Sequence, residues 1–360
     1  MVEPPVTLTV DTRYEIESLD LQVRERRTIH ADPATCSVVR ARTDPPCREH
    51  GQAAVCGSES QGNRSRGRYD FRMRDYDLDL DEIARRSVEA RDRGATEVCM
   101  QGGIHPEYTG ATYLDICRTV KAAVPQMHVH AFSPLEITHG AKTLSLSIET
   151  FLKQLREAGL GSLPGTAAEI LDDDVRRVIC PDKLSTAEWV NVIRIAHGLG
   201  IPTTSTIMFG HMETPRAWAR HLLRIRDLQQ STGGLTEFVP LPFVHMEAPM
   251  YLRGVARKGP TYRETLLMHA VARLALHPLV RNIQTSWVKL GATGAADCLK
   301  AGANDLGGTL MNESISRAAG ASHGQELTPD KVNALVENLG RFAQQRLSRS
   351  GRGQSCGLDG

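Results

Sequence analysis

The sequence predicts an α/β fold, a TIM-type (βα) barrel of parallel strands, on three observations. Helical and strand patterns alternate along the chain from Asp77 onward. Seven strand candidates are each preceded by a helix, which implies parallel βαβ units. No Gly-x-Gly-x-x-Gly opens a helix after a strand, which disfavours the alternative, a doubly wound dinucleotide-binding sheet.

The individual elements follow from hydrophobic periodicity. The first helix, 79–93, is amphipathic, with Leu80, Ile83, Ala84 and Val88 on one face. The strand 96–100 follows it as a short apolar run. We expect later helices at 112–123, 147–158, 187–199, 215–230, 262–276, 295–301 and 329–346, and later strands at 127–132, 161–163, 202–208, 236–241, 282–288 and 305–310.

An eight-stranded barrel needs one more strand, which should lie with its loop before residue 76. Residues 35–74 are rich in Arg, Ser, Gly and Cys and keep neither a helical nor a strand period. We therefore divide the chain into a disrupted or poorly ordered segment (1–75), a barrel (76–346) and a tail (347–360). In this interpretation the first strand and its loop are disrupted, and one side of the barrel is incomplete.

Composition excludes several classes of function. The 360 residues are 41% hydrophobic and 24% charged, as in globular proteins. Lys plus Arg (43) balance Asp plus Glu (42), so neither nucleic-acid nor membrane binding is expected. No apolar run approaches the roughly 20 residues that span a bilayer, and the N-terminus lacks signal-peptide features. We expect a cytoplasmic protein whose eight cysteines stay reduced.

Polar residues gather where the predicted strands end, which is where the chemistry of such barrels sits. They predict a polar small-molecule pocket. Purely structural roles are the alternatives: the glycine pair could form a tight turn, Glu213 could cap a helix, and Asp305 could orient a loop. The candidates are Gln101, Gly102, Gly103, Ser133, Glu136, Glu169, His211, Glu213, His245, Asp305, Gly307 and Gly308.

Two histidines and an arginine pair are ambiguous. His128 and His130 alternate along one strand and so point to the same face, either in a pocket with Glu136 or as structural residues. Arg176 and Arg177 are interpreted first as a solvated face.

The cysteines predict no metal by their spacing alone. Cys36, Cys47 and Cys56 follow Cys-x10-Cys-x8-Cys, which matches no compact zinc or iron–sulfur signature. Cys99 and Cys117 fall in a predicted strand and helix and are expected in the core.

The segments at the strand ends resemble FO synthase, specifically its tyrosine-adding subunit, which is the C-terminal half of the fused enzyme. The resemblance runs from about Tyr76 to about Arg346. It is carried by EVCMQGGIHP at 97–106, HAFSPLEI at 130–137, LPGTAAEIL at 163–171, TIMFGH at 206–211, TGGLTEFVPLPF at 232–243, QTSWVKLG at 284–291 and ANDLGGTLM at 303–311.

The resemblance implies a radical S-adenosylmethionine (SAM) enzyme with a [4Fe-4S] cluster, which joins the side chain of L-tyrosine to 5-amino-6-(D-ribitylamino)uracil. A separate ring-closing partner would complete the deazaflavin. By position, cofactor contacts are implied for Gln101, Gly102, Gly103, Ser133, Glu136 and Glu169, with Arg176 a weaker candidate. Substrate contacts are implied for His211, Glu213, His245, Asp305, Gly307 and Gly308.

The sequence departs from this family at one motif. Members carry Cys-x3-Cys-x2-Cys after the first strand to hold the cluster. That spacing occurs nowhere in the 360 residues, and Cys36, Cys47 and Cys56 are only weak candidates for a rearranged site. We interpret residues 30–75 as an out-of-frame version of the motif-bearing segment, which resequencing of the gene would test.

The sequence leaves open three alternatives to a transferase of this type. One is an inactive homologue that binds only ligand or a partner, and another is a radical SAM enzyme of the futalosine route. The third is a lyase or aldolase without a cluster, which would use Lys289 at a strand end as a Schiff base.

Overall fold

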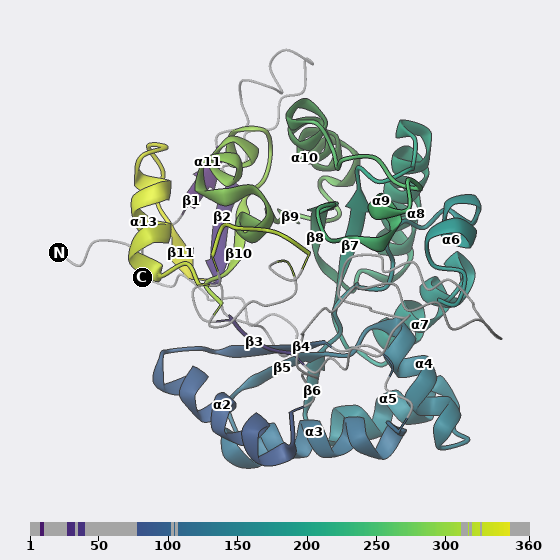
Figure 1. The fold of residues 1–360 in the computed structure, drawn as a ribbon. Coiled ribbons are helices and arrows are strands. Elements are labelled where there is room, and N and C mark those ends of the chain that lie inside the picture. The colour runs from purple at the N-terminus through teal and green to yellow at the C-terminus, as the bar shows by residue number, and fades with distance from the viewer. Residues whose placement is uncertain are drawn as a thin grey trace.

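The strands form a ring, and all the pairings between neighbours around it are parallel (Figure 1). The computed structural model describes residues 8–10, 27–32, 35–39, 78–101, 104, 107–310, 316, 319–324 and 326–345. For 8–10, 27–32, 35–39, 101, 344 and 345 it describes the backbone alone. The described ring strands are β2 (Arg27–Asp32), β3 (Thr35–Val39), β4 (Glu97–Gln101), β5 (His128–Ala131), β6 (Leu160–Ser162), β7 (Thr203–Phe209), β8 (Leu235–Pro242), β9 (Asn282–Ile283) and β10 (Asp305–Gly308).

Three runs of strands and two isolated bridges close the ring. Strands β3 to β6 pair in chain order, and so do β7 to β9. A bridge from Leu163 to Thr203 joins β6 to β7, and one from Gln284 to Asp305 joins β9 to β10. Strand β10 pairs with β2, which closes the ring because β2 and β3 are consecutive in the chain. The TIM-type barrel that the sequence predicts is confirmed.

The missing first strand lies before residue 76, as the sequence predicts. Strands β2 and β3 together fill its place between β10 and β4. The prediction that one side of the barrel is incomplete stays a prediction, because residues 33–34 and 40–77 lie outside the described residues. Strands β1 (Leu8–Val10) and β11 (Gln344–Gln345) add to the edge of β2. Residues 40–77 and 346–360 lie outside the described residues, and with them most of the segment 30–75 interpreted as out of frame and the whole of the predicted tail.

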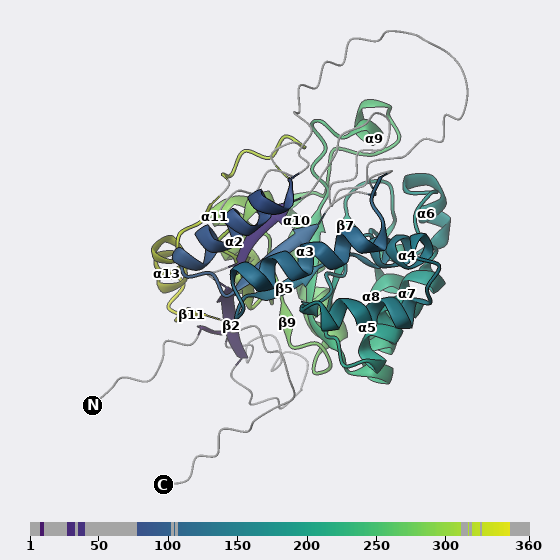
Figure 2. The ribbon, with the colours of Figure 1, turned by 90° about the horizontal axis from the view of Figure 1, so that it is seen from below.

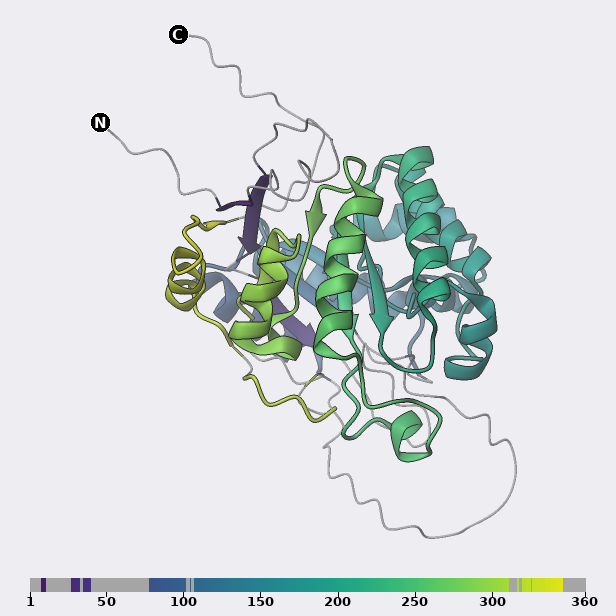
Figure 3. The same cartoon turned by 90° about the horizontal axis from the view of Figure 1, so that it is seen from above.

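Helices cover the outside of the ring. Figure 2 shows α2, α3 and α5 over β4 to β6, and Figure 3 shows α8, α10 and α11 over the other side. No helix of the described residues is long and apolar enough to cross a bilayer. The described helices are α2 (Leu80–Asp92), α3 (Gly110–Ala123), α4 (Pro134–Thr143), α5 (Ile148–Glu157), α6 (Asp173–Ile179), α7 (Thr186–Gly198), α8 (Pro215–Thr232), α9 (Pro249–Leu252), α10 (Tyr262–Leu276), α11 (Trp287–Lys300) and α13 (Pro329–Glu337).

The core lies mainly between the strands and the helices. Val98 and Val129 of neighbouring strands are fully buried together with Phe151 and Trp189 of the outer helices. A second cluster joins α11, β10 and α13 around Trp287. Of the face predicted for the first helix, Ile83 is buried but Leu80 is 38% exposed, because Leu80 is the first residue of the helix.

The predicted strand 282–288 is wrong beyond Ile283. Helix α11 begins at Trp287, whose indole N–H donates to the carbonyl of Gly308 at 2.9 Å. A short apolar run fits a buried strand and a buried helix equally well, so periodicity alone fails here. The predicted helix 329–346 ends early, at Glu337.

Three of the described helices were not predicted, and one of them carries a sequence signal. Ser133 is the N-cap of helix α4, and Glu136 completes a capping box with it. Helices α6 and α9 have only 7 and 4 residues, too few to show a helical period.

Candidate functional site

Most of the predicted site residues follow the carboxyl ends of successive parallel strands, so the ring brings these segments to one mouth. Ser133 and Glu136 follow β5, Glu169 follows β6, His211 and Glu213 follow β7, and His245 follows β8. Asp305, Gly307 and Gly308 form β10 itself. Gln101 ends β4, and Gly102 and Gly103 lie outside the described residues.

Ser133 and Glu136 bond to each other and so build the start of α4. One carboxylate oxygen of Glu136 accepts from both the amide and the hydroxyl of Ser133, each at 2.7 Å. Both residues are buried, and Phe132 before them has a left-handed φ of 66°. The strand is thus turned sharply into the helix, with Glu136 held close below the mouth.

Glu169 lies on the loop after β6 and is only 3% exposed. Its Oε1 accepts from Nζ of Lys183 at 2.9 Å, and both side chains are buried. Ala167 and Glu169 both have left-handed φ angles, 56° and 45°. Such angles are rare in residues with a side chain, so the surrounding contacts must hold this loop in place.

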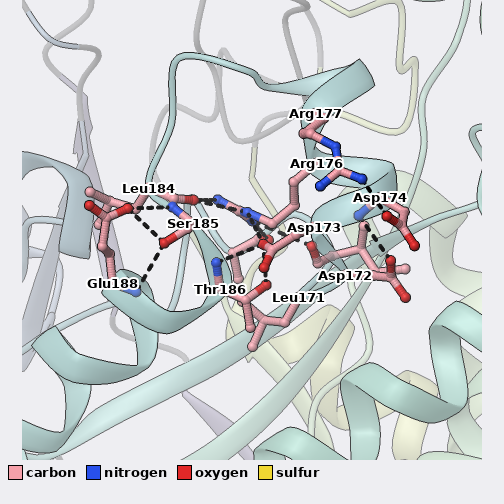
Figure 4. A network of polar contacts seen from close by, with 12 residues as sticks. Leu171, Asp172, Asp173, Asp174, Arg176, Arg177, Leu184, Ser185, Thr186 and Glu188 are labelled. Carbon is pink, nitrogen blue, oxygen red and sulfur yellow. Dashed lines mark hydrogen bonds and ion pairs between the residues drawn. The ribbon is translucent and has the colours of Figure 1, made fainter.

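Arg176 provides those contacts (Figure 4). Its guanidinium donates to the carbonyls of Ala168 and Leu184, and to that of Ala167 at 3.4 Å. Arg176 is 3% exposed, so its interpretation as part of a solvated face is wrong. Arg177, the next residue of α6, is exposed and pairs with Asp174. The structure makes Arg176 a clamp on the Glu169 loop.

Other elements fix the same loop. The indole N–H of Trp189 donates to the carbonyl of Thr166 at 3.1 Å, and the amide of Met208 donates to that of Glu169 at 2.7 Å. The amide of Leu171 donates to Nδ1 of His221 at 2.9 Å. Burial lowers the pKa of His221 to about 3, so this imidazole stays neutral and can accept.

His211 and Glu213 form a closed pair with no exposed side-chain surface. Nδ1 of His211 lies 2.9 Å from Oε2 of Glu213. The carboxylate also accepts from the amides of Gly210 and His211 and, at 2.7 Å, from the indole of Trp218. Burial opposes the charge, but His211 and these donors outweigh it and lower the pKa of Glu213 to about 2. The pair orders the turn after β7.

His245 is half-buried, and its ring meets that of Tyr251 edge to face at 4.7 Å between centroids. Burial and the charge of Lys258 lower its pKa. It is more exposed than His211, the other imidazole predicted for the site, which is fully buried.

Asp305 is fully buried, and its Oδ1 accepts from the amide of Gly307 at 2.7 Å. Gly307 has a φ of 71°, and a Cβ there would lie 2.9 Å from Oε1 of Gln284. The loop-orienting reading of Asp305 is therefore supported by its contacts. Lys289, the Schiff-base candidate, lies within α11 instead of at a strand end, and its Nζ donates to Ser316 at 3.3 Å.

The cysteines do not fit the cluster that the family resemblance implies. Cys36 lies in β3, and Cys47 and Cys56 fall in the stretch between β3 and α2, outside the described residues. The three are spaced Cys-x10-Cys-x8-Cys, not Cys-x3-Cys-x2-Cys. Elsewhere in the described part, no three His, Cys, Asp or Glu residues group as metal ligands. Cys117 is a core residue as predicted, and burial raises its pKa to about 12; Cys99 is half-buried.

Comparison with known proteins decides the family. Residues 56–225 match the radical SAM superfamily, and residues 232–349 match the family described as CofH/MqnC C-terminal region. The chain is 52% identical over 271 residues to the 5-amino-6-(D-ribitylamino)uracil–L-tyrosine 4-hydroxyphenyl transferase of Methanopyrus kandleri. That match covers 75% of this chain and 73% of the relative. The chain belongs to the CofH-type radical SAM family.

Within that family, FO synthases match over the same region. The chain is 55% identical to FO synthase of Streptomyces avermitilis over 276 residues and 54% identical to that of Mycobacterium tuberculosis over 271 residues. These matches cover 77% and 75% of this chain but only 32% of each relative, so the chain spans about a third of their length. The futalosine-route alternative is not favoured.

Solved structures agree on the fold. Methylornithine synthase superposes with a TM-score of 0.60 at 18% identity, over 88% of this chain and 84% of that chain. The hydrogenase maturase HydG also gives 0.60, at 12% identity, over 92% and 67%. Lys183, His221 and the clamping role of Arg176 were not found from the sequence, because these side chains lie outside the strand-end segments that periodicity locates.

Proposed function

We propose that this CofH-type barrel binds SAM, 5-amino-6-(D-ribitylamino)uracil and L-tyrosine, and joins the tyrosine side chain to the uracil. The observation that carries the proposal is the 52% identity to the archaeal transferase across 73% of its length. The convergence of buried acidic and glycine-rich segments at one mouth supports it. A ring-closing partner would act on the product.

The residues at the mouth suit these ligands. Glu169, fixed by Lys183 and by the clamped loop, would accept hydrogen bonds from the ribose hydroxyls of the nucleoside. The backbone groups of β10 and the half-buried His245 would meet the amino acid or the uracil. Arg176 would affect ligand binding only by holding the Glu169 loop, because its guanidinium already donates hydrogen bonds to backbone carbonyls.

The [4Fe-4S] cluster implied by the family would supply the electron that cleaves SAM. Because the cysteine spacing of this chain does not fit that cluster, we derive no step through it. The same observation favours a second candidate, a homologue that binds the ligands without turnover.

Binding and turnover separate the two candidates. The purified chain is titrated by calorimetry with SAM and with the ribitylaminouracil, and Glu169→Gln serves as the matched variant. Micromolar binding that weakens at least tenfold for SAM in the variant supports the assigned mouth. No binding of either ligand to the wild-type chain would refute the proposal.

Turnover is then measured after anaerobic treatment with iron and sulfide, with the archaeal transferase as a positive control. Product formation supports the transferase. A colourless protein that binds both ligands but cleaves no SAM establishes the second candidate.

A further inference from the structure

Two histidines inside the barrel share one serine hydroxyl. Nε2 of His128 and Nδ1 of His130 both lie 2.7 Å from Oγ of Ser162 on the neighbouring strand β6. As predicted from their alternation, the two histidines share a face of β5. Ser162 and His130 are 7% and 8% exposed, and the side chain of His128 is 9% exposed.

This face is the interior of the barrel. The hydroxyl of Thr203 contacts Nε2 of His197 on α7 at 2.9 Å, so Thr203 faces the outer helices. Leu163 is the bridge partner of Thr203 and shares that side. Ser162 precedes Leu163 in the strand and therefore points inward with the two histidines.

Proton counting restricts what this cluster can be. A serine hydroxyl carries one proton, so it donates to at most one of the two imidazoles. If it donates to one, the ring nitrogen of the other must donate to it. The three groups then form a directed chain of hydrogen bonds that reverses when a proton enters at one end.

We propose that His128, Ser162 and His130 form a proton relay along the barrel interior. When His128 carries protons on both ring nitrogens, the proton on Nε2 passes to Oγ of Ser162 while the proton of Ser162 passes to Nδ1 of His130, so His128 becomes neutral and the positive charge moves to His130. No atom is oxidised or reduced, and rotation of the hydroxyl resets the chain. The reverse transfer carries a proton away from His130.

The relay runs along the strand direction. His130 is one residue before the end of β5, whereas His128 begins that strand, roughly 6–7 Å further from the mouth. Glu97 lies 3.8 Å from Nε2 of His128 and is its partner across the strands, and Cys99 is the partner of His130. These are the titratable side chains that β4 pairs with the relay. His128 and Glu97 therefore form the end away from the mouth.

A glycine makes room for the arrangement. A Cβ at Gly161 would lie 2.3 Å from Cε1 of His128, so only glycine lets the ring lie against β6 and reach Ser162. That the proton comes from or goes to the substrates rests on the proposed function. The hydrogen-bond chain itself does not.

The test reads the ring nitrogens directly. In the full-length chain labelled with ¹⁵N-histidine, two-bond ¹H–¹⁵N correlation spectra show which nitrogens carry protons, and His128→Gln and His130→Gln assign the signals. We expect one of the two nitrogens facing Ser162 to be protonated and the other not. Ser162→Ala should abolish this ordering, and Ser162→Thr, which keeps the hydroxyl, should preserve it. Two protonated or two unprotonated nitrogens would overturn the relay.

A second readout tests its role. In a preparation that turns over, Ser162→Ala should lower kcat by about 100-fold with less than a twofold change in ligand Kd, and Ser162→Thr should restore most of the rate. An unchanged kcat in Ser162→Ala would overturn the catalytic role. If the wild-type chain does not turn over, the proposed function fails while the nitrogen spectra still decide the relay.

Discussion

Replacing Glu213 by Gln tests whether this buried carboxylate holds the turn after β7. The glutamine keeps the shape but loses the charge that faces His211. One of its two acceptor oxygens is also replaced by an NH2 group, which cannot accept the hydrogen bonds that Gly210, His211 and Trp218 donate to the carboxylate. We expect a folded but clearly less stable protein.

The magnitude follows from the pKa of Glu213, which falls from 4.5 to about 2 in the folded protein. At about 1.4 kcal/mol per pH unit, ionisation of this group stabilises the fold at pH 7 by about 3 kcal/mol. Because the folded pKa lies below the unfolded one, this contribution is full above about pH 5. It is lost as the pH falls toward 2, and roughly 2 kcal/mol of it is gone at pH 3.

Urea unfolding followed by circular dichroism measures the difference at several pH values. The control is Glu149→Gln, an exposed partner of Lys153, which should change the free energy of unfolding by less than about 0.5 kcal/mol. If Glu213→Gln costs under about 1 kcal/mol at pH 7, or if the gap stays constant down to pH 3, the carboxylate is not the anchor inferred here.

Two further predictions concern packing and buried titration. Gly165→Ala would place a Cβ 2.3 Å from the carbonyl of Thr204, so we expect the free energy of unfolding in urea to fall by about 1–3 kcal/mol. The control Gly198→Ala lies in open space on α7 and should be neutral or stabilising. Equal effects of the two changes would contradict this expectation. Burial lowers the pKa of His269 from 6.5 to about 4 in the folded protein. Between these two pH values the unfolded chain binds a proton that the buried ring does not, so the fold becomes less stable as the pH falls through this range. In His269→Gln the melting temperature should therefore fall less between pH 7 and pH 5, and an unchanged slope would exclude His269 as a source of it.

Elements with complete local signals were predicted well. Helix α10 spans Tyr262–Leu276, as predicted, because Thr261 and Glu264 form a capping box and a helical period runs through the segment. The strand 282–288 failed because its apolar residues are buried by α11 and β10, and burial alone does not distinguish strand from helix.

The sequence predicted the positions of the candidate site residues better than it predicted their contacts. Parallel strands must end together, so the positions of Glu169 and His211 at one mouth follow from the strand order, whereas Asp305 begins β10. Their partners do not follow. Nothing near Arg176 in the sequence says that it binds the carbonyls of the Glu169 loop, and nothing near His128 says that it shares Ser162 with His130.

The sequence by itself determined the alternating helices and strands, the parallel barrel, the family and the absence of the Cys-x3-Cys-x2-Cys spacing. These properties are written in local periodicity and in short motifs. Only the tertiary structure decided that β2 and β3 lie between β10 and β4 and that Arg176 is buried as a clamp. It also decided that the carboxylate of Glu213 stabilises the turn after β7. Those outcomes depend on which groups meet in the folded chain, and burial then fixes their charge and their hydrogen bonds.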